Sequence, residues 1–114
     1  MKLLKITSLE SGWHDRDEIL LHAVFQTLVD FMEKEHVEAI AWDADEPQRK
    51  AWAELTDIYK WWKEVRPKRV NPPDDAKLGL QEMVDEYYQY EQRSWDEDQN
   101  NLHRLINVRH FMWT

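Results

Sequence analysis

The chain of 114 residues contains no cysteine, only two glycines and only four prolines. Without cysteine it has no disulfide, no thiolate metal site and no thiol nucleophile. So few turn-forming residues disfavour an all-β fold built on many tight turns. No apolar run approaches the ~20 residues of a membrane span, and the first apolar stretch is too short for a signal peptide. We therefore expect a soluble cytoplasmic protein.

Positive charge is also scarce, because 23 acidic residues outnumber 15 basic ones and give a net charge of −8. This balance disfavours long nucleic acids and anionic membranes as partners. The basic residues gather in one segment, 60–69, which contains Lys60, Lys63, Arg66, Lys68 and Arg69. The two glycines, Gly12 and Gly79, cannot form a glycine-rich phosphate loop. We expect no cofactor.

Apolar periodicity is the main structural signal. It predicts helices over residues 15–35, 45–66, 74–93 and 96–113, preceded by a short strand or extended arm at 2–9. The first helix has a wide apolar arc that begins at Leu20, and Leu80, Val84 and Tyr87 lie on the apolar side of the third. The second helix is expected to begin near Asp45, with Pro47 in its first turn, and to end before Pro67, since proline disfavours helical backbone at the residue before it. Short connections between four helices predict an all-α fold, a compact bundle of about four helices in a single domain spanning residues 1–114.

Tryptophan is abundant, with Trp13, Trp42, Trp52, Trp61, Trp62, Trp95 and Trp113. Trp61 is distinctive because helical geometry points it about 110° away from the apolar face of its helix. Its neighbours on that flank include Asp57 and Glu64. We interpret Trp61 as an exposed anchor for a protein partner, with Trp42 as a possible addition to the same surface. The alternative is that another helix covers it.

The opposite flank of this helix carries Tyr59, Lys63 and Arg66. Aromatic and basic side chains together can stack a base and hold a phosphate, so a nucleotide-sized ligand is a second hypothesis. The alternative is a solvated helix end. Arg109 falls inside an apolar stripe near the C-terminus. A guanidinium there must form a structural ion pair, reach solvent, or grip an anion.

Four carboxylates suggest one enzymatic alternative. Glu35-x-x-Glu38 and Glu54-x-x-Asp57 resemble the motif spacing of the all-α nucleoside triphosphate pyrophosphatases of the MazG-like group. The resemblance covers these four residues and implies magnesium bound by their carboxylates. Otherwise we expect no metal site and no catalytic residues.

Three blocks of sequence, residues 11–35, 52–67 and 102–114, resemble a family of small tailed-bacteriophage proteins without established chemistry. The resemblance implies expression in an infected bacterium, where such proteins often serve host takeover or counter-defence. We therefore expect an acidic accessory protein that binds a host protein. The alternatives are a nucleotide sponge, a virion component and the magnesium-dependent pyrophosphatase. Spare aromatic residues would also suit a homodimer.

Overall fold

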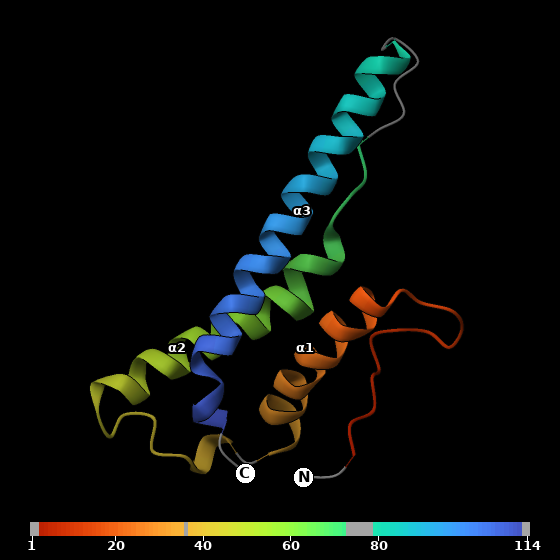
Figure 1. Ribbon diagram of the computed structural model, residues 1–114. Helices are drawn as coiled ribbons and strands as arrows, with labels where there is room; N and C mark the ends of the chain where they lie inside the picture. The colour runs from red at the N-terminus through yellow and green to blue at the C-terminus, as the bar shows by residue number, and fades with distance from the viewer. Residues whose placement is uncertain (1–2, 36, 73–78, 113–114) are drawn as a thin grey trace.

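The computed structural model describes residues 3–35, 37–72 and 79–112. The chain forms three α-helices, α1 (Arg16–Lys34), α2 (Glu46–Lys60) and α3 (Leu80–Val108) (Figure 1). Short helical turns are η1 (Val37–Ala39), η3 (Arg66–Lys68) and η4 (Arg109–Met112), and η2 (Trp61–Val65) is a π-helix. The described residues contain no strand, and those before α1 form an extended arm. The all-α prediction is confirmed, whereas a strand at the start is not observed.

The two helices predicted over 74–93 and 96–113 are wrong as separate elements, because α3 is continuous for 29 residues. No glycine or proline occurs between Leu80 and Val108, so nothing interrupts the backbone hydrogen bonds at the predicted break. The described chain therefore has three α-helices rather than four. The predicted start near residues 74 and 75 lies outside the described residues, as does Trp113.

The second predicted helix begins where expected, since the Asp45 side chain accepts the backbone N–H of Gln48 at 2.8 Å. Its predicted end at Arg66 is wrong by two residues. The backbone stays helical through η2 and then through η3, which places Pro67 in the first turn of that short helix. Proline is tolerated there because a first-turn N–H needs no helical acceptor.

The hydrophobic core lies where α1, α2 and the C-terminal half of α3 meet. Five of its side chains are almost fully buried: Phe25, Leu28, Leu55, Ile58 and Leu105. The apolar arc predicted for the first helix is buried only in part, because Leu20 at its start is exposed. The core thus occupies one end of the molecule.

The molecule is elongated, with extents of 57 × 34 × 19 Å and a radius of gyration of 17.5 Å. A compact chain of this length would have a radius of gyration of about 13 Å. The prediction of a compact bundle is therefore wrong. At 15 residues, α2 is about half as long as the 29-residue α3. The N-terminal half of α3 accordingly extends beyond the body (Figure 1).

Candidate functional site

Trp61, the predicted exposed anchor, is buried, with only 8% of its surface accessible. Its indole Nε1 donates a 2.6 Å hydrogen bond to Oε1 of Glu97 on α3, and its ring lies 5.6 Å from that of Phe25. The prediction of exposure is wrong because α3 covers the flank that α2 leaves open. The π-helical turn also begins at Trp61, so the α-helical spacing used for the prediction ends there.

The other members of the predicted binding surface do not gather around an exposed tryptophan. Trp42 is buried, stacks on Trp52 at 4.9 Å and donates its Nε1 hydrogen to the Val37 carbonyl at 2.9 Å. Asp57 accepts a 2.7 Å hydrogen bond from Arg104 Nη2, and Glu64 is exposed on η2. Burial of both tryptophans removes the aromatic part of the surface proposed from the sequence.

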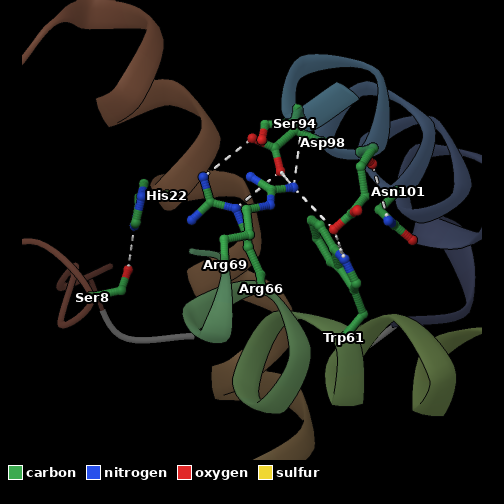
Figure 2. Close-up of polar contacts among 9 residues, drawn as sticks. Ser8, His22, Trp61, Arg66, Arg69, Ser94, Asp98 and Asn101 are labelled. Atoms are coloured by element: carbon green, nitrogen blue, oxygen red, sulfur yellow. Dashed lines mark hydrogen bonds and ion pairs between the residues drawn. The ribbon is translucent and has the colours of Figure 1, made fainter. Parts of the chain in front are cut away.

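Arg66 and Arg69 instead join η3 to α3 through Asp98 (Figure 2). Asp98 accepts hydrogen bonds from Arg66 Nε and Nη2 at 3.0 and 3.2 Å, and from Arg69 Nη2 at 2.7 Å. Arg69 Nη2 also contacts Glu97 Oε1 at 3.0 Å. We call these four side chains the Asp98 cluster. Burial alone would raise the pKa of the Asp98 carboxyl, but the two arginines outweigh burial and lower it.

Sequence reasoning missed Glu97, Asp98 and Arg69 as partners. The available signal was complementary charge, because the basic segment 60–69 has a match in the acidic run 96–98. Charge complementarity could suggest that the two segments meet. It could not specify which carboxylate meets which arginine, since the pairs are about 30 positions apart.

Tyr59 and Lys63 share a flank, as predicted, but both contact Glu33 on α1. The Tyr59 hydroxyl donates to Glu33 Oε2, and Lys63 Nζ lies 3.4 Å from the same oxygen. Burial, and then the Glu33 carboxylate, raise the pKa of Tyr59 to about 12. Tyr59 therefore links α2 to α1. Its ring is not part of the cavity that Lys63 and Arg66 line.

That cavity has a volume of about 330 Å³ and lies between the N-terminal arm, α1 and the η2–η3 segment. We call it the arm cavity. Ser8 from the arm and His22 from α1 line it, with Ser8 Oγ 2.7 Å from His22 Nδ1. Burial, followed by the charge of Arg66, lowers the pKa of His22. No pattern in the sequence indicated this pair, because Ser8 belongs to an arm without regular periodicity.

The carboxylates of the predicted magnesium site do not form a metal-binding group. Both Glu54 and Asp57 bind Arg104 of α3. Within the described residues, which include Glu35 and Glu38, no three histidine, aspartate or glutamate side chains lie close enough to hold a metal ion. The pyrophosphatase-like spacing therefore does not bring its four carboxylates together.

Arg109 does not lie in a core stripe as predicted. It is exposed, and its Nη1 donates to the Ile106 carbonyl of its own turn at 3.1 Å. The helix tightens from α to 3-10 geometry at this residue, so the α-helical spacing no longer applies. Ile106, from the same predicted stripe, is also exposed. Arg109 consequently does not form a buried anion-binding fork.

Exposed apolar side chains gather along one face of the extended half of α3, and Glu91 interrupts them between Tyr88 and Trp95. Helical geometry places five exposed side chains within about 100° of its circumference. They are Leu80, Val84, Tyr87, Tyr88 and Trp95. We call them the α3 stripe. Leu80, Val84 and Tyr87 were predicted to face the core of a bundle, but Leu80 is 77% exposed and the other two about half.

Loop residues 69–72 do not cover the stripe. Val70 and Pro72 line a separate hollow with Glu86, Tyr90 and Arg93, which lie on another face of α3 by helical geometry. The stripe thus lies on a different face of α3 from this hollow, with the Tyr87 and Tyr90 rings 6.3 Å apart between the two.

Comparisons with protein-family models, with curated proteins and with solved structures return no match. Among the described residues, no helix has the length and apolar character needed to cross a membrane.

Proposed function

We propose that the protein is a protein–protein interaction module and that the α3 stripe is its contact surface. The observation that carries this proposal is the exposure of aromatic and aliphatic side chains along one face of a helix that extends beyond the body. Single exposed apolar residues are ordinary, whereas several that gather along one helix face are typical of an interaction site. Tyrosine and tryptophan, both present here, are also enriched among residues that dominate binding energy.

The stripe is presented on a pre-ordered helix. The C-terminal half of α3 is anchored in the core by Leu105 and to η3 by the Asp98 cluster. The N-terminal half continues the same helix without a break. A partner therefore need not supply all the free energy of helix formation, and rigid presentation lowers the entropic cost of binding.

The charge around the stripe indicates the chemistry of the partner. Residues 80–96 contain five acidic side chains, Glu82, Asp85, Glu86, Glu91 and Asp96, against Arg93 alone. A second copy of this chain would bring like charges together, which disfavours pairing. A protein with an apolar groove flanked by basic residues would match both the stripe and the acidic character of this half of α3. The resemblance to tailed-phage proteins favours a bacterial host protein in this role.

The test compares capture of proteins from a bacterial lysate by the wild-type chain and by a Val84→Ala/Tyr88→Ala variant, followed by calorimetry with the purified captured protein. Both residues are exposed and alanine favours helix, so the variant should keep its fold. Binding should weaken by at least about tenfold. Gln89→Ala, on another face beside Tyr88, is the matched control and should bind like the wild type.

Two results would overturn the proposal. One is that every captured protein binds the Val84→Ala/Tyr88→Ala variant as tightly as it binds the wild-type chain. The other is sedimentation showing that the stripe instead joins two copies of this chain. The captured protein should also bind more weakly as salt is raised, because the acidic residues of this half of α3 attract a basic partner and salt screens that attraction.

A further inference from the structure

No carboxylate lines the arm cavity, although the chain is acidic overall. It is bordered by two cations, Lys63 and Arg66, by His22 and by the hydroxyl of Ser8. These side chains come from the N-terminal arm, α1, η2 and η3, so the fold assembles donors that are distant in sequence. A cavity with this lining is suited to an anion.

Both cations keep donors beyond those used by their acidic partners. Arg66 binds Asp98 through Nε and Nη2, while Nη1 makes no hydrogen bond within the described part of the chain. Asp98 thus fixes the orientation of the guanidinium beside the cavity. Lys63 Nζ contacts Glu33 at 3.4 Å, and its ammonium has three donors in all.

The apolar wall of the cavity does not offer a stacking surface. Trp62 lines the cavity, but Phe25 stacks on one face of its indole at 4.4 Å. The Arg66 guanidinium lies 4.9 Å from the same ring, and must occupy the other face because Phe25 fills the first. No face of Trp62 is left for a nucleobase. A volume of about 330 Å³ is also at the lower end of the range for small-molecule sites.

We propose that the arm cavity binds a small phosphate monoester, with the phosphate held by Lys63, Arg66 and Ser8, whose hydroxyl donates to the phosphate while it accepts the Nδ1 hydrogen of His22. A carboxylate ligand is less well matched. Planar carboxylates favour a two-pronged edge of arginine, and Asp98 already occupies one of the two such edges of Arg66, the one formed by Nε and Nη2. The remaining donors come from separate elements around the cavity, an arrangement that suits the three oxygens of a phosphate. This site is independent of the α3 stripe.

Calorimetry with glycerol 3-phosphate, glycerate, inorganic phosphate and adenosine monophosphate tests the proposal on the full chain. Glycerol 3-phosphate should bind more tightly than glycerate. Lys63→Gln should weaken its binding by about tenfold through loss of a charge-assisted hydrogen bond. Lys60→Gln is matched in charge change but does not border the cavity, and should leave binding unchanged.

Nuclear magnetic resonance provides the second readout. Glycerol 3-phosphate should shift the resonances of the His22 ring and the Ser8 amide in the wild type, with smaller shifts in Ser8→Ala. The proposal is overturned if no phosphate compound binds, or if glycerate binds more tightly than glycerol 3-phosphate. It is also overturned if Lys60→Gln and Lys63→Gln weaken binding equally, since that result indicates non-specific attraction to positive charge.

Discussion

Replacing Asp98 by asparagine tests whether the Asp98 cluster fastens α3 to η3. Asp98 accepts three hydrogen bonds from Arg66 and Arg69, and its side chain is only 15% exposed. Asparagine has one acceptor oxygen and no charge, so at least one bond is lost and the others weaken. Bonds to charged groups contribute about 1.5–3 kcal/mol each. Because Arg69 keeps its contact with Glu97, we expect a loss of about 2–3 kcal/mol.

Urea denaturation followed by circular dichroism measures this loss. For a domain of this size the midpoint should fall by about 1–2 M. Asp96→Asn is the matched control, because Asp96 lies on the same helix, is exposed and, among the residues that the structure describes, accepts only from Gln92 of its own helix. The control should change the free energy of unfolding by less than about 0.5 kcal/mol.

The pH dependence gives a second check with a defined sign. The pKa of Asp98 is lower in the folded protein than its ordinary value, so its contribution to stability is complete above that ordinary value, near pH 4. The contribution is lost as the pH falls through the lowered pKa. The difference in the free energy of unfolding between wild type and Asp98→Asn should therefore become smaller below about pH 4. A loss under about 0.5 kcal/mol at pH 7, or a difference that stays constant in acid, would refute the reasoning.

Three further predictions follow from burial and hydrogen bonding. Leu105→Ala should reduce the free energy of unfolding by about 2–5 kcal/mol in chemical denaturation, because Leu105 is only 1% exposed. Leu80→Ala should change it by less than about 0.5 kcal/mol, because Leu80 is 77% exposed. Thr56→Val should leave stability unchanged or raise it, since the buried Thr56 Oγ1 has no hydrogen-bond partner among the described residues; a lower melting temperature would contradict this. In proton resonance titrations, His22 should titrate below 6.5 and His14 above it, because burial lowers the pKa of His22 while hydrogen bonds to Glu10 and Glu18 raise that of His14. By itself the lowered pKa of His22 makes the free energy of unfolding fall as the pH drops from about 6.5 toward that pKa, whereas the raised pKa of His14 acts in the opposite direction. Two histidines that titrate at the same pH would contradict this prediction.

The features that the sequence predicted well are local. The first helix was placed to within one residue at each end, and Asp45 with Pro47 located the start of α2. Both follow from apolar spacing and from groups that satisfy the first backbone amides of a helix. The unbroken length of α3 was missed, although the absence of glycine and proline from Leu80 to Val108 was visible in the sequence.

The candidate site was harder to predict because it depends on contacts between elements. The spacing within one helix shows which way Trp61 leaves α2, but not that α3 lies on that side and supplies Glu97. For the same reason an apolar stripe indicates that a helix face has a partner without identifying the partner. Leu80 and Val84 were therefore assigned to a core that the described chain does not build around them.

The most direct test of the α3 stripe is site-specific photo-crosslinking in bacterial cells that express the protein. A photoreactive benzoylphenylalanine replaces Tyr88 in one variant and Gln89 in another, and crosslinked products are identified by mass spectrometry. The account predicts a discrete crosslink to one cellular protein from position 88 and none from position 89. Equal crosslinking from both positions, or crosslinks only between copies of this chain, would contradict it.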